Sequence, residues 1–430
     1  MVESKQALEK DGGLKRETVM MWGKKEKLKL VIIGHVDHGK STLIGRLLLD
    51  TNSLPKEKLE ELKKISEELG KETELAYLSD QLKEEREQNK TIDTTQLFFK
   101  SKKREYIIID APGHAEFIKN MLTGASLAQA AVLIVDTKEG IMEQTRRHAY
   151  LIKMLGVENI IVVFNKMDLV NYSVKRFEEI KKEFLSFLGN LHIKPLFIIP
   201  VSARTGLNIS KRSSLAPWYK GPFLLQALDS LTVRKSKKDN PLRFCVQDIY
   251  KNNDGEIIVG KVISGILKQG EEALLMPLYG KIKIKSIKIF PKNVKQASEG
   301  ENIGLIIDGA AKITRGDIIV QKKNPPQALS SFEGNIFWMS EEPLVANTAV
   351  TVRCSTQESN CIVEKIQKRV NSSTLETIEE NGREVRMNEA AVVTFKTEKP
   401  IVIEKLSCTE ELGRFTLERG RNPQGIGIIT

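Results

Sequence analysis

The residues best suited to chemistry in this sequence run from Gly34 to Ser41 and read Gly-His-Val-Asp-His-Gly-Lys-Ser. This spacing is typical of a loop whose backbone N–H groups bind the phosphates of a nucleotide. In such a loop Lys40 reaches the β- and γ-phosphates, and the Ser41 hydroxyl is a ligand for Mg²⁺. Gly34 and Gly39 let the backbone approach the phosphates. We therefore expect these residues to bind the nucleotide: Gly34, His35, Val36, Asp37, His38, Gly39, Lys40, Ser41 and Thr42.

The segments on either side of this loop predict the elements that position it. Residues 28–33 are apolar and rich in branched side chains, which favours a buried strand. Residues 42–49 have the apolar spacing of a helix. The positive end of that helix dipole then faces the phosphates.

Strand-like and helix-like segments alternate from residue 28 to about residue 231, which predicts a mostly parallel sheet with helices on both faces. A long, charged segment of helical pattern, residues 55–90, is inserted between the first two strands. The expected strands include residues 31–33, 106–109, 131–135, 160–164 and 196–201, and the expected helices include residues 115–122, 142–155 and 174–188.

Polar residues near the γ-phosphate side of the site follow the strand at residues 106–109. Asp110 can hold Mg²⁺ through a water molecule, and Gly113 can donate its backbone N–H to the γ-phosphate. Thr91 can close over the γ-phosphate and Mg²⁺, so the expected metal ligands are Ser41, Thr91 and Asp110. His114 is the candidate catalytic residue, because a ring beside Gly113 can orient a water molecule toward the γ-phosphorus. A surface or helix-capping histidine is the alternative.

The sequence Asn-Lys-Met-Asp, residues 165–168, follows the strand at 160–164 and indicates which base is bound. The Asp168 carboxylate can accept hydrogen bonds from N1–H and the 2-amino group of guanine, and adenine offers neither. Asn165 is expected at the other edge of the ring, and the Lys166 stem over its face. The segment Ser202-Ala203-Arg204 can donate a backbone N–H to the guanine O6.

The second half of the chain has many short strand-like segments separated by turn signals, which favours small barrels. The predicted organisation is an α/β nucleotide-binding domain followed by two all-β barrel domains. The expected boundaries are a flexible N-terminal extension at 1–27, the nucleotide-binding domain at 28–234, and barrels at 240–323 and 331–430.

Composition narrows the class of partner. The formal net charge is +11, and basic residues outnumber acidic ones most clearly between residues 231 and 296. There Lys281, Lys283 and Lys285 alternate with isoleucines, which indicates either a lysine face that guards a sheet edge or a surface for acidic partners or RNA. No apolar run is long enough to span a membrane, and the scattered Cys245, Cys354, Cys361 and Cys408 favour free thiols in the cytoplasm.

Taken in order, these motifs resemble the translation-factor superfamily of GTPases over about residues 28–430. The resemblance rests on residues 34–41, Lys90-Thr91-Ile92-Asp93, residues 110–114, residues 165–168 and residues 202–204. It implies GTP as the substrate, Mg²⁺ as the cofactor, and hydrolysis to GDP and phosphate.

A finer resemblance rests on residues 85–88, 143–148, 165–172, 217–222, 243–247, 315–317 and 338–344. In these residues the chain is most similar, within that superfamily, to the GTPase subunit of sulfate adenylyltransferase. That resemblance implies a small adenylyltransferase partner, which makes adenosine 5'-phosphosulfate from ATP and sulfate, and it implies that GTP hydrolysis drives this synthesis. The alternative is a factor like elongation factor 1-alpha that delivers tRNA or a release protein to the ribosome. The basic second domain and residues 412–415, Leu-Gly-Arg-Phe, favour that alternative.

Overall fold

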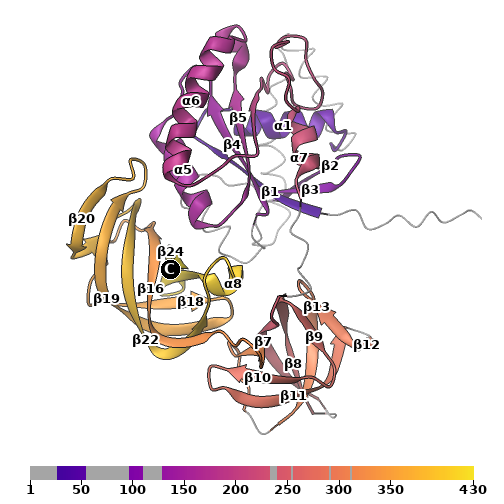
Figure 1. Ribbon diagram of the computed structural model, residues 1–430, viewed down its shortest axis with the longest axis vertical. Coiled ribbons are helices and arrows are strands. Elements are labelled where there is room, and N and C mark those ends of the chain that lie inside the picture. The colour runs from indigo at the N-terminus through magenta and orange to yellow at the C-terminus, as the bar shows by residue number, and fades with distance from the viewer. Residues whose placement is uncertain are drawn as a thin grey trace, which may run out of the picture.

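The computed structural model describes residues 27–54, 96–109, 128–232, 240–252, 255–289, 292–309 and 312–430. The N-terminal extension, the charged insertion at 55–90, the predicted helix at 115–122 and most of the linker before the first barrel lie outside these ranges. Within them the chain forms an α/β domain and two β-barrels, as the sequence predicts (Figure 1).

A six-stranded sheet forms the centre of the α/β domain, in the order β2-β3-β1-β4-β5-β6. Every neighbouring pair is parallel except β2 and β3, which are antiparallel. The strands are β1 Lys27–Gly34, β2 Gln96–Lys100, β3 Glu105–Ile109, β4 Ala130–Asp136, β5 Asn159–Asn165 and β6 Phe197–Pro200. The helices are α1 Lys40–Asp50, α5 Glu143–Met154, α6 Val174–Asn190, α7 Leu224–Ser230 and the short 3₁₀ helix η1 Met167–Val170.

Both faces of this sheet are buried, which is why its strands are almost wholly apolar. In β1, Val31 and Ile33 pack into one apolar cluster with α5 and α6. Leu30 and Ile32 point the other way, into a second cluster with α1 and α7. The two helical layers lie on opposite sides of the sheet in Figure 1. The parallel strands therefore end together at one edge, where the loops after β1, β5 and β6 meet.

The first barrel closes because β10 pairs with both β15 and β11 in a sheet of order β10-β15-β7-β8-β14-β11-β12. Its strands β7 and β8 pair as far as Asn252 and Gly255. Its strands are β7 Arg243–Asn252, β8 Gly255–Ser264, β9 Ile266–Lys268, β10 Glu272–Met276, β11 Gly280–Ile289, β12 Lys292–Val294, β13 Gln296–Ser298, β14 Asn302–Asp308 and β15 Ile318–Gln321.

The alternating lysines of β11 have the exposure expected from the sequence. Lys281, Lys283 and Lys285 are exposed, whereas Ile282 and Ile284 are buried. However, β11 is paired with β10 on one side and β14 on the other, so it is not a sheet edge. The edge-guarding interpretation is therefore wrong, because barrel closure removes that edge.

The second barrel closes in the same way, through β18 pairing with both β23 and β19 in the order β18-β23-β24-β16-β22-β19-β20. Its last strand is β24 Asn422–Ile429. The other elements are β16 Gln327–Trp338, β17 Leu344–Val345, β18 Ala349–Cys354, β19 Gln357–Asn371, β20 Thr377–Gly382, β21 Glu384–Val385, β22 Glu389–Ile403, α8 Glu410–Gly413 and β23 Arg414–Arg419.

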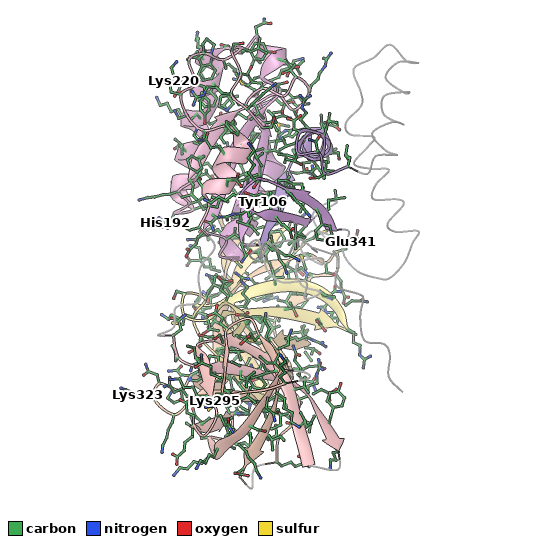
Figure 2. The ribbon with its side chains drawn as sticks, turned by 90° about the vertical axis from the view of Figure 1, so that its right-hand side faces the viewer. Tyr106, His192, Lys220, Lys295, Lys323 and Glu341 are labelled. Atoms are coloured by element: carbon green, nitrogen blue, oxygen red, sulfur yellow. The ribbon has the colours of Figure 1, made fainter. Side chains whose placement is uncertain are left out.

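The second barrel contacts both of the other units. Phe337, Met339 and Ile426 belong to the same apolar cluster as α5 and α6 of the α/β domain. At the first barrel, Val402 and Leu412 pack with residues of β7, β8, β10 and β15. Figure 2 shows the three units stacked along the long axis, with Tyr106 in the α/β domain and Lys295 and Lys323 on the first barrel.

Two further observations concern the described residues. None of the described helices is long and apolar enough to cross a membrane. All four cysteines are free thiols, and all but Cys408 are buried.

Candidate functional site: a nucleotide-binding edge

The phosphate-binding loop lies between the end of β1 at Gly34 and the start of α1 at Lys40. Its two glycines are required by close packing against protein atoms. A Cβ on Gly34 would lie 2.4 Å from the Ile134 carbonyl oxygen on β4. A Cβ on Gly39 would lie 2.5 Å from Asn165 Nδ2, and Gly39 has φ +90°. The structure therefore adds a steric reason for glycine that the local sequence pattern does not contain.

Lys40 folds back over the loop that precedes it. Its ammonium donates to the carbonyl oxygens of Gly34 at 2.9 Å and His35 at 2.8 Å. Ser41 and Thr42 are half-buried in the first turn of α1. No side chain caps this turn, and it contains no acidic residue. A helix start that has no side-chain cap and no acidic residue, and whose first residue is a lysine, is chemically suited to bind a polyphosphate.

Asn165 connects the phosphate-binding loop to the segment that follows β6. Its Nδ2 donates to the His38 carbonyl oxygen at 2.9 Å, and its Oδ1 accepts from the Ala203 backbone N–H at 2.9 Å. The side chain is buried, so both bonds are shielded from water. Asn165 therefore fixes the distance between the two segments predicted to hold the phosphates and the base.

The residues predicted to recognise guanine lie immediately beyond Asn165. Lys166 has φ +61°, and its ammonium pairs with Asp136 at 2.7 Å, which holds the lysine stem in place at the end of β4. Asp168 is half-buried in η1, and its Oδ1 is buried without a hydrogen-bond partner among the described residues. A buried carboxylate oxygen without a donor is costly. A ligand with N–H donors, such as guanine, would remove that cost.

The base loop, residues 202–206, follows β6. It is a tight turn in which the Gly206 N–H donates to the Ser202 carbonyl at 2.8 Å and the Thr205 N–H to Ser202 Oγ at 3.2 Å. The structure thus brings Ser202, Ala203 and Arg204 close to Asn165, as the sequence predicts for strands ending at one edge. Ala203 gives its N–H to Asn165. Donation from this loop to a guanine O6 stays a prediction.

The two loop histidines contact residues that the sequence analysis assigned no role. His35 Nδ1 is hydrogen-bonded to Gln144 Oε1 in the first turn of α5. His38 is fully buried, with Nε2 3.3 Å from Glu139 Oε2 and Nδ1 3.4 Å from the Ile134 carbonyl. Burial is the main reason that the pKa of His38 is below its usual value. The signal that could have found Asp136 and Glu139 is their position directly after an apolar strand.

Four predicted site residues lie outside the described residues: Thr91, Asp110, Gly113 and His114. Val36 and Asp37 are exposed at the loop tip, and Asp37 has φ +62°.

Among the residues that the structure describes, no group of three or more His, Cys, Asp or Glu side chains could hold a metal ion. Ser41 is the one predicted Mg²⁺ ligand that is described, and its hydroxyl oxygen suits that hard cation.

Comparisons with protein families agree with this geometry and cover both barrels. Residues 25–236 match the elongation factor Tu GTP binding domain. Residues 255–320 match elongation factor Tu domain 2, and residues 331–430 match the GTP-eEF1A C-terminal domain-like family.

Curated relatives match almost the whole chain. Elongation factor 1-alpha from Ignicoccus hospitalis is 41% identical over 95% of this chain and 97% of the relative. The factor of the same name from Aeropyrum pernix is 40% identical over 94% of this chain and 97% of the relative. That from Thermoplasma acidophilum is 39% identical over 92% and 96%. Among solved structures, sup35 complexed with GDP is 25% identical, with a TM-score of 0.44 over 97% of each chain.

These relatives overturn the expected function in sulfate activation. They are named elongation factor 1-alpha, and nothing in the comparisons supports an adenylyltransferase subunit or its small partner. The structure gives a reason for the error. Residues that carried the finer resemblance stabilise the fold: Trp218 donates to the Tyr172 carbonyl at 3.1 Å, and Trp338 to the Glu342 carbonyl at 2.8 Å. Packing residues of this kind serve any branch that keeps the fold.

One assignment follows from the sequence motifs and the geometry at the strand ends, together with the three matching domains and the identity to the relatives. The chain belongs to the translation-factor GTPase family, together with elongation factor Tu and elongation factor 1-alpha.

Proposed function

We propose that this protein is a translation GTPase that carries aminoacyl-tRNA to the ribosome and hydrolyses GTP to GDP and phosphate there. The GTP-binding part rests on one observation above others, the buried Asp168 Oδ1 that has no hydrogen-bond partner among the described residues. The tRNA part rests on relatives named elongation factor 1-alpha, which match the barrels as well as the α/β domain.

The proposed roles follow the positions of the residues. The phosphates are held by the loop from Gly34 to Ser41 together with Thr42. Lys40 leaves the carbonyl oxygens of its own loop, to which it donates here, and reaches the β- and γ-phosphates. Asp168 accepts from guanine N1–H and the 2-amino group, and Lys166 covers the ring. When bound, Mg²⁺ neutralises charge that develops on the phosphate oxygens. Ser41 would hold it, and Thr91 and Asp110 are proposed as its further ligands.

Hydrolysis needs a positioned water molecule more than a strong base. We assign that positioning to His114, with Gly113 donating its backbone N–H to the γ-phosphate. Bond cleavage leaves GDP and inorganic phosphate. In the His114→Ala variant, GTP should bind as in the parent protein, while single-turnover hydrolysis slows by at least about a hundredfold. Unchanged hydrolysis would remove the assigned role.

The delivery function has a direct test. The protein with GTP should protect the ester bond of aminoacyl-tRNA from spontaneous hydrolysis, because the bound end of the tRNA is shielded from water. Two controls are matched to this test. In one the protein is loaded with GDP, and in the other a deacylated tRNA is added as competitor. Protection that depends on GTP and on the aminoacyl group supports the proposal. Equal binding of acylated and deacylated tRNA, or no protection with GTP, contradicts it.

A further inference from the structure

The base loop is held from a second direction that the family motifs do not include. Asn165 on β5 fixes it through Ala203, and Arg46 of α1 contacts it at the Arg204 carbonyl oxygen. Helix α1 is also the helix whose first turn carries Lys40 and Ser41. One short helix therefore touches both the phosphate-binding loop and the base loop.

Arg46 packs directly against the backbone of the base loop. Its Nη1 lies 3.5 Å from the Arg204 carbonyl oxygen. A Cβ placed on Gly206 would lie 2.4 Å from Arg46 Nη2 and 2.8 Å from Cζ, so any larger residue there would have to displace the guanidinium. Gly206 also has φ +80°, a conformation that other residues rarely adopt.

The Asp50 carboxylate holds the Arg46 guanidinium in this position. Arg46 Nε lies 2.9 Å from Asp50 Oδ1, one helical turn further along α1. The other oxygen, Asp50 Oδ2, accepts from Ser210 Oγ at 2.6 Å. The two side chains are 24% and 12% exposed, which limits the motion of the pair. Asp50 thus binds Arg46 and the segment after the base loop at the same time.

We propose that Arg46, held by Asp50, is a positioning residue for base selection. Arg46 fixes the position of the base loop, so that a backbone N–H of residues 202–204 lies within hydrogen-bond distance of guanine O6. Arginine suits this role because its planar group offers several donors in a fixed geometry, which a lysine cannot reproduce. The inference rests on the proposed GTP-binding function and deepens it, by assigning part of the selectivity to a residue outside the base-reading motifs.

The alternative is that Arg46 and Asp50 form an ordinary ion pair between residues four apart on a helix, of little consequence for binding. The two roles differ in one measurable quantity. A merely structural pair affects all nucleotides equally. A residue that positions the base loop affects only the part of the affinity that depends on the contact between this loop and guanine O6.

The experiment compares GTP with 6-thio-GTP, which keeps N1–H and the 2-amino group but replaces the O6 acceptor with a weaker one. Dissociation constants are measured by calorimetry with Mg²⁺ present. The parent protein should prefer GTP by about fivefold to tenfold, the value of one hydrogen bond. In the Arg46→Ala variant this ratio should fall to about one to two, with weaker GTP binding.

Two further variants separate positioning from folding. Arg46→Lys keeps the ion pair with Asp50 and should retain the thermal stability of the parent, yet lose the preference for GTP over 6-thio-GTP. Arg212→Ala is the matched control, because Arg212 donates to the carbonyls of Tyr219, Lys220 and Gly221 in the same connection but away from the base loop. It should leave the ratio unchanged.

The outcomes are distinct. A parent-like ratio in both Arg46 variants overturns the inference while leaving the proposed function intact. An equal loss for both nucleotides also overturns it and supports the ion-pair alternative. If the parent protein binds neither nucleotide, the proposed GTP-binding function itself fails.

Discussion

At the scale of single residues, the carboxylate of Asp168 is informative because one of its oxygens is buried without a donor. In the Asp168→Asn variant an amide replaces that acceptor, so an N–H faces the N–H groups of guanine. We expect the affinity for GTP to fall about 10- to 100-fold, the value of hydrogen bonds to a charged group, and that for xanthosine triphosphate to rise.

Competition between the two nucleotides measures this change. Asp248→Asn is the control, because Asp248 accepts from the backbone N–H of Ile249 on β7, in the first barrel. A variant at Asp168 that keeps the parent preference for GTP would contradict the assignment of that residue to the base.

His38 predicts a pH dependence of stability. Its pKa in the folded protein is lowered by burial, so the unfolded chain binds more protons near the usual histidine pKa. The stability that this neutral ring contributes is complete above about pH 6.5 and is lost as the pH falls through the folded pKa.

Urea denaturation at about pH 7.5 and about pH 5.5 measures this effect. The parent protein should lose more stability on acidification than the His38→Asn variant does. The exposed His192, which has φ +54°, provides the matched control His192→Asn. Equal losses in the parent and the His38 variant would rule out this source of pH dependence.

The sequence indicated candidate residues for the site, but it did not indicate their contacts with one another. The spacing of Gly34, Lys40, Asn165 and Asp168 depends on local chemistry, which one segment contains. The bond from Asn165 to the His38 carbonyl joins positions 127 apart, and no local pattern encodes it. The same is true of Arg46, whose helix gave no sign of the loop that it contacts.

At the scale of elements, long apolar strands were predicted closely and short or atypical elements were missed. The strand expected at 160–164 is β5 Asn159–Asn165, and the helix expected at 142–155 is α5 Glu143–Met154. Helix α7 has seven residues, too few for a periodic pattern to be recognised. The antiparallel edge strand β2 begins at Gln96, after the charged insertion at 55–90, and only its pairing with β3 defines it.

Helix α5 joins the site to the second barrel. Its first turn contacts His35 through Gln144, and its last residues meet Arg414, whose Nη2 donates to the Leu155 carbonyl and lies 3.4 Å from Glu410. A cation suits this helix end because the carbonyl dipoles converge there. Burial lowers the pKa of Arg414.

Arg414→Met should therefore lower the free energy of unfolding by about 1–3 kcal/mol, because the Leu155 carbonyl loses a charged donor. Denaturant titration, monitored by tryptophan fluorescence, measures this loss of stability. Arg383→Met, at an exposed arginine of the same barrel, should change stability by less than about 0.5 kcal/mol. A similar effect of the two substitutions would show that the contact with α5 contributes nothing.

At the scale of the whole molecule, the two barrels are joined by a buried ion pair. Arg243 donates from Nη2 to Glu404 Oε1 at 2.6 Å and from Nε to Oε2 at 3.2 Å. It also donates to the carbonyls of Leu242 and Asn324, and Thr409 donates to Glu404. Every charged group here is satisfied by a hydrogen bond, which the low exposure of Arg243 requires.

Arg243→Met should destabilise the protein by about 3–5 kcal/mol, because it leaves the Glu404 carboxylate buried without its partner. Removing both charges, in Arg243→Met with Glu404→Leu, should restore much of that loss. Thermal and urea unfolding of both variants measure it. A neutral single substitution would mean that this ion pair contributes nothing to the association of the barrels.

The apolar cluster that includes Phe337, Met339 and Ile426 has a practical consequence for work on fragments. These side chains come from the second barrel, yet they complete the cluster built on α5 and α6. A truncated protein ending near residue 232 would expose to solvent the apolar surface of α5 and α6 that these side chains cover. Such a fragment should therefore self-associate at concentrations where the intact chain is monodisperse, and replacing the uncovered side chains with polar ones should restore its solubility.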